Sequence, residues 1–152
     1  MKREDIIKLE HRLLDILLGR FNLLQTSKEK EELVEEALAQ VLQEEKFSLF
    51  RSELEVQETR IKCIRKFLSY EIVTGLLCDI NVEDIIINSL SPIYMHHGEL
   101  GFVSTNQRFE THAELDLFIR KLLLFSGRSK LKKIMNLELP NLEGRVNIAL
   151  ST

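Results

Sequence analysis

Residues 83–104 read EDIIINSLSPIYMHHGELGFVS, and residues 105–150 continue as TNQRFETHAELDLFIRKLLLFSGRSKLKKIMNLELPNLEGRVNIAL. The three isoleucines within residues 84–88 predict a short strand, and an unbroken β-branched run is typical of a strand buried on both faces. Pro92 suits the start of the next strand. Residues 93–97 and 100–104 then predict a hairpin that turns around Gly98.

Behind this hairpin the apolar residues recur at helical spacing. Thr111 and Glu114 form a T-x-x-E capping box, whose two side chains satisfy free backbone N–H groups at the start of a helix. Gly127 stands where a left-handed C-terminal cap belongs. Residues 134–139 and 145–150 alternate as strands. This order predicts an α+β fold, with a small, mainly antiparallel sheet and one helix packed against it.

The first half of the chain predicts three amphipathic helices, at about residues 3–24, 26–46 and 52–73. A second T-x-x-E capping box, Thr26 to Glu29, marks the start of the middle one. The third has an apolar stripe of Ile61, Ile64, Leu68 and Ile72. We expect the stripes to pack against one another as a bundle, although such helices can also dock on a partner protein. The predicted domains are a helical region, 1–74, and an α/β domain, 75–152.

Composition narrows the class of protein. The chain has 152 residues, 44% of them hydrophobic and 30% charged, which fits a globular protein. The net charge of −3 offers no overall basic field for nucleic acid. Cys63 and Cys78 fit buried thiols in a reducing cytoplasm, with a bridge between them as the less favoured alternative. The charged N-terminus lacks the apolar stretch of a signal peptide.

Few residues suggest chemistry by themselves. Residues 126–129, SGRS, are not a phosphate-binding P-loop, because Leu122 and Arg128 stand where glycine and lysine are required. The four histidines, at positions 11, 96, 97 and 112, have no metal-ligand spacing and are predicted to lie on the surface. Paired glutamates at 31–32, 35–36 and 44–45 predict a solvated helix face. The basic run 128–133 predicts a solvated loop, with an anion site as the alternative.

Four stretches stand out by their order: VEDIIIN at 82–88, PIYMHHGEL at 92–100, RF at 108–109 with GR at 127–128, and MNLELPNLEGRVN at 135–147. Together they resemble the N-terminal domain of the secretion and pilus-assembly ATPases of the type II/type IV secretion superfamily, in particular the tight-adherence (Flp) branch. That family has a strand x-[ST]-[DE]-I-[ML]-V-N, a hairpin x-[VI]-[YF]-V-E-R-x-G-K-L, an R-F…GR helix and x-D-A-R-L-P-D-G-S-R-V-N. The resemblance covers residues 76–150.

The resemblance implies a PAS-like N-terminal domain that precedes a RecA-like ATPase domain in a hexameric motor, which uses ATP and Mg²⁺. The resemblance also implies that the protein is cytoplasmic and peripheral at the inner membrane. Its implied partners are neighbouring subunits of the hexamer and an inner-membrane platform protein. Arginines of the N-terminal domain reach the nucleotide phosphates, because a fixed cationic fork stabilises developing negative charge. By position these are Arg145, in R-V-N, and secondarily Arg128, in GR. No nucleic-acid partner and no catalytic or metal residue is expected in this chain.

This sequence departs from the family pattern at three points. Asn136 replaces the acidic residue of D-A-R, Glu138 replaces its arginine, and the turn before Arg145 is one residue longer. Glu138 would repel a phosphate. The sequence carries no Walker A or Walker B motif, so we expect it to be inactive alone and to continue into a motor domain beyond Thr152. The alternative is a stand-alone adaptor or sensor that binds protein partners through its helical half.

Overall fold

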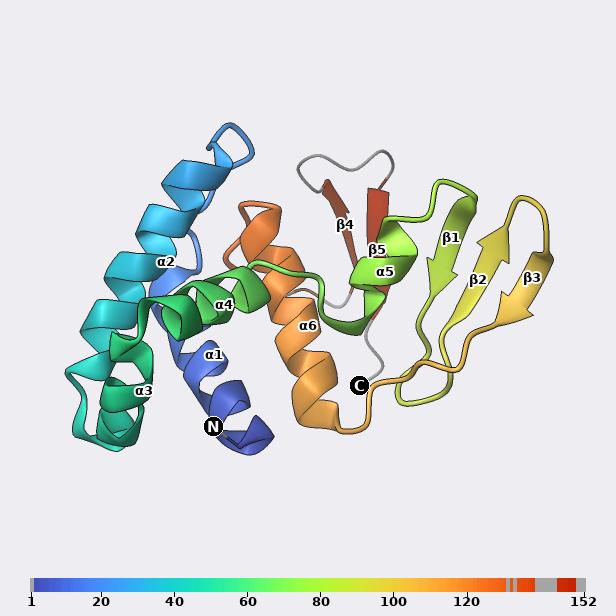
Figure 1. Ribbon diagram of the computed structural model, residues 1–152. Helices are drawn as coiled ribbons and strands as arrows, with labels where there is room; N and C mark the ends of the chain where they lie inside the picture. The colour runs from blue at the N-terminus through green and yellow to red at the C-terminus, as the bar shows by residue number, and fades with distance from the viewer. Residues whose placement is uncertain (1, 131, 133, 139–144, 150–152) are drawn as a thin grey trace. The chain divides into compact units, whose positions relative to one another are not determined.

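A computed structural model describes residues 2–130, 132, 134–138 and 145–149 (Figure 1). It has the predicted α+β fold, in which helices come first and strands predominate later. The helical elements are α1 (Arg3–Leu17), α2 (Ser27–Leu42), η1 (Glu45–Phe50), α3 (Arg51–Glu55), α4 (Gln57–Phe67), η2 (Glu71–Val73), α5 (Thr74–Leu77) and α6 (His112–Phe125). The strands are β1 (Val82–Ile86), β2 (Tyr94–His97), β3 (Gly101–Ser104), β4 (Ile134–Glu138) and β5 (Arg145–Ala149).

Contacts along the chain gather it into two compact units. Unit 1 comprises Met1–Leu68 and Ile119–Thr152, and unit 2 comprises Ser69–Phe118. This grouping differs from the predicted domains 1–74 and 75–152, because the second half of α6 groups with the N-terminal helices. The last four residues of that half, Leu122 to Phe125, are all buried, and so is Lys121. The assignment of residues 75–152 to the N-terminal domain of a secretion-type ATPase stays a prediction.

The first two predicted helices form, but both end earlier than predicted, the second at Leu42 and not near residue 46. The capping box at Thr26 is confirmed, since the Glu29 N–H donates to Thr26 Oγ1 at 3.1 Å and the Thr26 N–H donates back to Glu29 Oε1 at 3.4 Å. The first helix ends at Leu17 and not at residue 24. Gly19, at φ 83°, follows the last turn, and its left-handed conformation is incompatible with a continued helix.

The third predicted helix, at 52–73, is wrong as one continuous element. It is divided into α3, α4, η2 and α5, with Val56 in an extended conformation between α3 and α4. Leu54 and Phe67 are both buried, yet 13 residues at 3.6 per turn would place them about 140° apart on one straight helix. The break at Val56 allows both side chains to reach the core. Of the predicted stripe, only Ile64 is buried.

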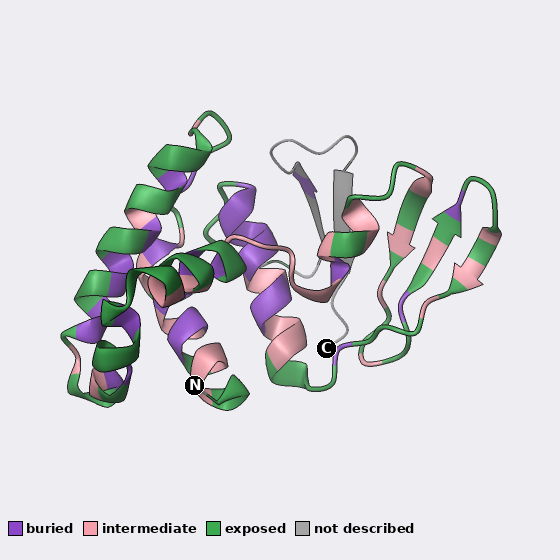
Figure 2. Ribbon diagram, viewed as in Figure 1, coloured by how far each residue is buried: buried purple, intermediate pink, exposed green. Residues whose placement is uncertain are grey.

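The core of unit 1 forms where α1, α2 and the second half of α6 bury their apolar side chains (Figure 2). Inside it lies an ion cluster. The carboxylate of Glu10 is 1% exposed and accepts a hydrogen bond from Lys121 Nζ, 0% exposed, at 2.7 Å. Its other oxygen accepts from Lys66, whose side chain is 46% exposed. Lys121 Nζ also lies 5.2 Å from the centroid of the Phe67 ring. This cluster ties α1 to α4 and α6.

The predicted strands all form, but they make two sheets and not one. In unit 2 the antiparallel order is β1-β2-β3, with the predicted hairpin between β2 and β3. In unit 1, β4 and β5 form a separate antiparallel pair. The expectation that residues 84–88 are buried on both faces is wrong. Strand β1 ends at Ile86, which is 45% exposed, and only one face of this sheet is covered.

Helix α6 has the predicted caps at both ends. The Glu114 N–H donates to Thr111 Oγ1 at 3.2 Å, while the reciprocal contact goes to the N–H of Glu110 at 3.2 Å. At the other end Gly127 has φ 77° and its N–H donates to Leu124 O at 3.1 Å. The Arg128 N–H donates to Leu123 O at 3.0 Å, which completes a Schellman motif.

Among the described residues, no helix is long and apolar enough to cross a membrane.

Candidate functional site

The two predicted phosphate-contact arginines, Arg145 and Arg128, both belong to unit 1. Arg145 is the first residue of β5, and its Cα partner in the antiparallel ladder is Glu138 of β4. The register therefore places Glu138, one of the departures from the family pattern, directly across the ladder from Arg145. The description of β5 covers its backbone only, so the side chain of Arg145 lies outside the described part of the chain.

Arg128 is exposed and follows directly on the cap of α6. Its backbone N–H is used in the Schellman motif, so the position of its Cα is fixed by the end of the helix. A cation is favourable at this end, because the helix dipole places partial negative charge on the last carbonyl groups. Of the basic run 128–133, Arg128, Lys130 and Lys132 are exposed, which agrees with a solvated loop, while residues 131 and 133 lie outside the description.

One face of the β1-β2-β3 sheet of unit 2 is exposed, and we call it the sheet face. Residues paired across antiparallel strands point to the same side. Two such rows make up the face, one of Asp84, His96 and Phe102, the other of Ile86, Tyr94 and Ser104. All six are exposed. On the opposite side of the sheet Ile85, Met95 and Val103 are half-buried and His97 is buried. That opposite side is therefore the covered one.

Aromatic side chains form the centre of the sheet face. The rings of Tyr94 and Phe102 stack with centroids 5.3 Å apart and planes at 8°. They are diagonal neighbours on adjacent strands, a spacing within reach of aromatic side chains. Phe102 is 62% exposed and Tyr94 38% exposed, and Leu100, beside them in the β2–β3 turn, is also exposed. An apolar cluster of this kind, open to solvent, is a feature that soluble proteins usually keep for binding.

Two acidic groups lie beside His96, which neighbours this aromatic centre on the sheet. His96 Nδ1 lies 3.3 Å from Glu83 Oε2 and 3.7 Å from Asp84 Oδ2, and all three side chains are largely exposed. Unit 2 as a whole has a single arginine, Arg108, no lysine and eight acidic residues, a formal charge of −7. The rest of the chain is therefore at +4, given the total of −3. The modest net charge of the whole chain conceals this separation.

The adjacent histidines occupy opposite sides of β2, as the alternation of a strand requires. His96 is exposed, as predicted, but the surface position predicted for His97 is wrong: it is 7% exposed. Its Nδ1 accepts hydrogen bonds from the N–H groups of Glu99 and Leu100, at 3.1 and 3.2 Å. Its Nε2 lies 3.5 Å from Asp79 Oδ2. The buried imidazole thus holds the β2–β3 turn that carries Leu100.

The cysteines differ from the expected buried pair. Both are free, and Cys78 is exposed while Cys63 is partly buried. Burial of Cys63 raises the pKa of its thiol, with a smaller contribution in the same direction from the Glu10 carboxylate. Among the described residues, no group of three or more His, Cys, Asp or Glu side chains could hold a metal ion.

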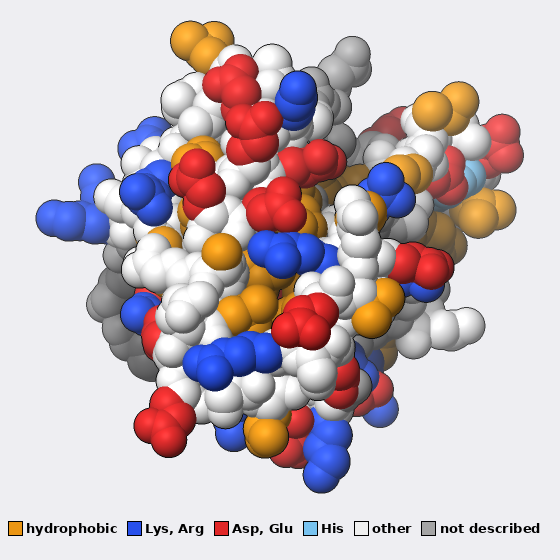
Figure 3. Space-filling model, turned by 60° about the vertical axis from the view of Figure 1, so that its left-hand side comes forward, with side chains coloured by type: hydrophobic (Ala, Val, Ile, Leu, Met, Phe, Trp, Pro, Cys, Tyr) orange, Lys and Arg blue, Asp and Glu red, His pale blue; other side chains and the backbone are white. Residues whose placement is uncertain are grey.

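Acidic and basic side chains are interspersed on the face drawn in Figure 3. Of the paired glutamates at 31–32, 35–36 and 44–45, all but Glu44 are exposed. Two of these acids also connect elements. The Arg12 Nε donates to both carboxylate oxygens of Glu44, at 3.0 and 3.1 Å, and Arg60 Nε lies 3.1 Å from Glu35 Oε1. These two ion pairs join α1 to Glu44, two residues beyond the end of α2, and α4 to Glu35 of α2, so the two acids do more than face solvent.

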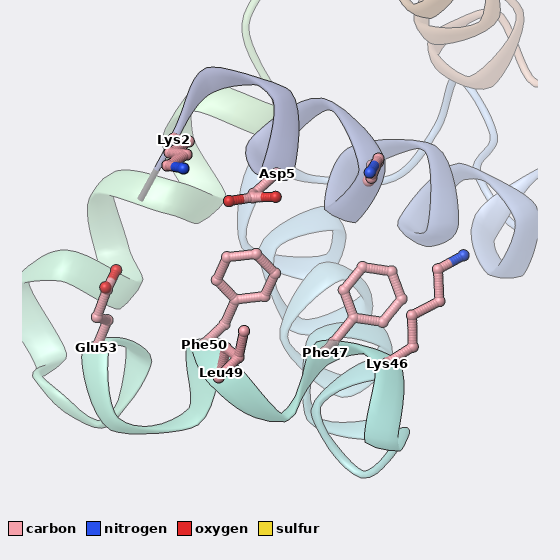
Figure 4. Close-up of a pocket in the computed structure, with 8 residues that line it drawn as sticks. Lys2, Asp5, Lys46, Phe47, Leu49, Phe50 and Glu53 are labelled. Atoms are coloured by element: carbon pink, nitrogen blue, oxygen red, sulfur yellow. The ribbon is translucent and has the colours of Figure 1, made fainter.

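Each unit also has a shallow pocket. In unit 1 a pocket of about 610 Å³ lies between α1 and the η1–α3 segment, with the rings of Phe47 and Phe50 pointing toward α1 (Figure 4). Both rings are buried and belong to the core, and three lysines and two acids form the rim. In unit 2 a pocket of about 540 Å³ is lined by Arg108 and its neighbours, a residue that the sequence analysis did not select as a site.

The chain matches no model of a known protein family and no curated protein.

Proposed function

We propose that this chain is the N-terminal region of a secretion or pilus-assembly ATPase of the type II/type IV secretion superfamily, in the tight-adherence branch. The observation that supports the proposal is the coincidence of four sequence landmarks with four structural elements in the same order. The landmarks were defined by residue identity alone, whereas the elements are defined by backbone hydrogen bonds. Agreement between local sequence and structure at successive positions favours a common fold over chance similarity of short motifs.

The landmarks coincide with the elements as follows. VEDIIIN, at 82–88, covers β1, and PIYMHHGEL, at 92–100, covers β2 and the turn to β3. The RF at 108–109 precedes α6, and the GR at 127–128 forms its C-terminal cap. The RVN at 145–147 opens β5. Phe109 also has a structural role that explains its place in the pattern, because it is buried and packs on Phe118 of α6 at 5.2 Å between ring centroids.

In this proposal Arg145 contacts a nucleotide phosphate and Arg128 supports it. A guanidinium keeps its charge at all relevant pH values, and its planar fork matches phosphate oxygens. Glu138, as the Cα partner of Arg145, would weaken that contact, because a carboxylate near the phosphate adds repulsion. We therefore expect weaker nucleotide contact than with an uncharged residue at position 138.

The remaining parts of the proposal concern the longer protein. ATP and Mg²⁺ would be held chiefly by a RecA-like domain that follows this chain, since the Walker motifs are not in its sequence. The chain itself would contribute contacts to neighbouring subunits of a hexamer and to an inner-membrane platform protein, at the cytoplasmic side of the inner membrane.

The first test is the mass of the native protein in its source cell. An intact mass far above 17.7 kDa, with a P-loop in the additional sequence, is the expected result. A native mass near 17.7 kDa would overturn the motor proposal and leave the adaptor or sensor interpretation.

The second test uses that native-length protein. Arg145→Ala is expected to lower ATP turnover at least tenfold, because transition-state charge stabilisation by one arginine is commonly worth more than that factor. Arg65→Ala, at an exposed position in the last turn of α4, is the matched control and should retain full turnover. Equal turnover of the two variants would remove Arg145 from the nucleotide site.

A further inference from the structure

We propose that the sheet face of unit 2 binds a positively charged segment of a partner protein, in which arginine or lysine alternates with aliphatic side chains. The inference stands on the exposure, aromatic stacking and charge of this face, and it does not depend on the proposed motor function. Its first component is apolar. Ile86, Tyr94 and Phe102 lie close together on adjacent strands and are 45%, 38% and 62% exposed. An aromatic centre of this composition is the kind of group that dominates binding energy in protein interfaces.

The second component is charge. Two carboxylates of the sheet, those of Glu83 and Asp84, lie beside His96. With a formal charge of −7 on unit 2, the field around the sheet face attracts cationic segments and repels nucleic acid and anionic lipid. Arginine suits both components at once, since its guanidinium can stack on an aromatic ring while its edge donates to a carboxylate.

The dimensions of the face favour a polypeptide over a small cation. Three strands about 4.8 Å apart span roughly 10 Å, and both apolar and acidic groups are spread over that width. A single ion could neutralise a carboxylate, but it could not cover the aromatic pair. An extended segment could do both, because its side chains alternate at a spacing comparable to the rows of the sheet.

The experiment measures binding to the full chain by fluorescence anisotropy. The probe is a short labelled peptide that alternates leucine with arginine, and its comparison is the same peptide with glutamate in place of arginine. Saturable binding of the arginine peptide alone, weakening as salt is added, is the expected result. Equal binding of the two peptides, or binding of neither, would overturn the proposal.

Variants locate the binding. Phe102→Ser, alone and together with Tyr94→Ser, is expected to lower the affinity for the arginine peptide about tenfold or more, because truncating a central aromatic residue commonly has an effect of that size. Because Phe102 is mostly exposed, the single variant should keep the fold, which far-UV circular dichroism checks. Glu83→Gln with Asp84→Asn should also weaken binding and flatten its salt dependence.

The matched control removes the same charge elsewhere. Glu31→Gln with Glu32→Gln alters two exposed acids of α2 in unit 1 and should leave affinity unchanged. Unchanged affinity in the aromatic variants, or equal loss in the control, would show that the peptide binds elsewhere and would overturn the assignment. Self-association of the chain that is abolished by Phe102→Ser would likewise overturn it, in favour of a second copy as the occupant.

Discussion

Replacing Glu10 by methionine should be the most destabilising single change in the ion cluster of unit 1. Glu10 and Lys121 are 1% and 0% exposed, and Glu10→Met leaves Lys121 fully buried without its carboxylate partner. Breaking a buried pair in this way costs about 3–5 kcal/mol. The converse change, Lys121→Met, should cost less, because Glu10 keeps Lys66, which reaches solvent.

The double variant separates the two physical contributions. Glu10→Met with Lys121→Met replaces both charges by apolar side chains of similar volume, a change that is often neutral or stabilising because no charge has to lose its hydration. We expect its stability to return close to that of the wild type. Because the double variant loses little, the coupling free energy from the double-mutant cycle should be at least as large as the loss in Glu10→Met alone, about 3–5 kcal/mol or more.

Urea unfolding followed by far-UV circular dichroism measures these values. With a slope of about 2 kcal/mol per molar urea, a loss of 4 kcal/mol lowers the midpoint by about 2 M. The exposed pair Lys62–Glu58, an i,i+4 pair on α4, provides the control, and Lys62→Met should leave the midpoint nearly unchanged. The reasoning is refuted if Glu10→Met shifts the midpoint no more than Lys62→Met does, or if the double variant loses the sum of the single losses.

Three further predictions concern individual positions. His97→Phe should lower the free energy of unfolding by about 1–3 kcal/mol, because two backbone N–H groups lose their acceptor, whereas His96→Phe on the exposed side should change it little; equal unfolding midpoints would contradict this. Gly127→Ala should lower the free energy of unfolding by about 1–2 kcal/mol, because the residue has φ 77° and the new Cβ would lie 3.3 Å from a backbone oxygen. A higher urea midpoint for this variant would exclude this account of the cap. Cys78 should react with a thiol reagent faster than Cys63, since a raised pKa leaves less thiolate on Cys63 at a given pH, and the Cys63 rate should continue to rise at higher pH; mass spectrometry of the labelled protein assigns the order.

Local features were predictable because they depend on residues a few positions apart. The capping box at Thr26, the cap at Gly127 and the β2–β3 hairpin are all where the sequence indicates. Each is defined by hydrogen bonds or backbone angles between residues no more than about ten positions apart, so the necessary information lies in one short stretch of sequence. The same reasoning failed for residues 52–73, where helical periodicity continues but the packing of Leu54 and Phe67 requires a break.

The candidate site was less predictable. Arg145 and Arg128 were selected by resemblance, while the sheet face depends on which side of β1-β2-β3 is covered. The isoleucine run at 85–87 reads as doubly buried, yet Ile86 is exposed because nothing covers that side of the sheet. The charge separation, by contrast, was present in the sequence and required only the bounds of unit 2 to be recognised.

The sequence by itself determined the α+β class, the order of the elements, the start of α2 and both ends of α6, because turns and caps follow from nearby side chains. Only the tertiary structure decided the division into two sheets and the burial of Glu10 with Lys121. A signal for that pair existed, since each charged residue has apolar neighbours three and four positions away on its helix. The pairing itself joins residues 111 positions apart, and a charge is buried only where the packing of distant segments brings it a partner.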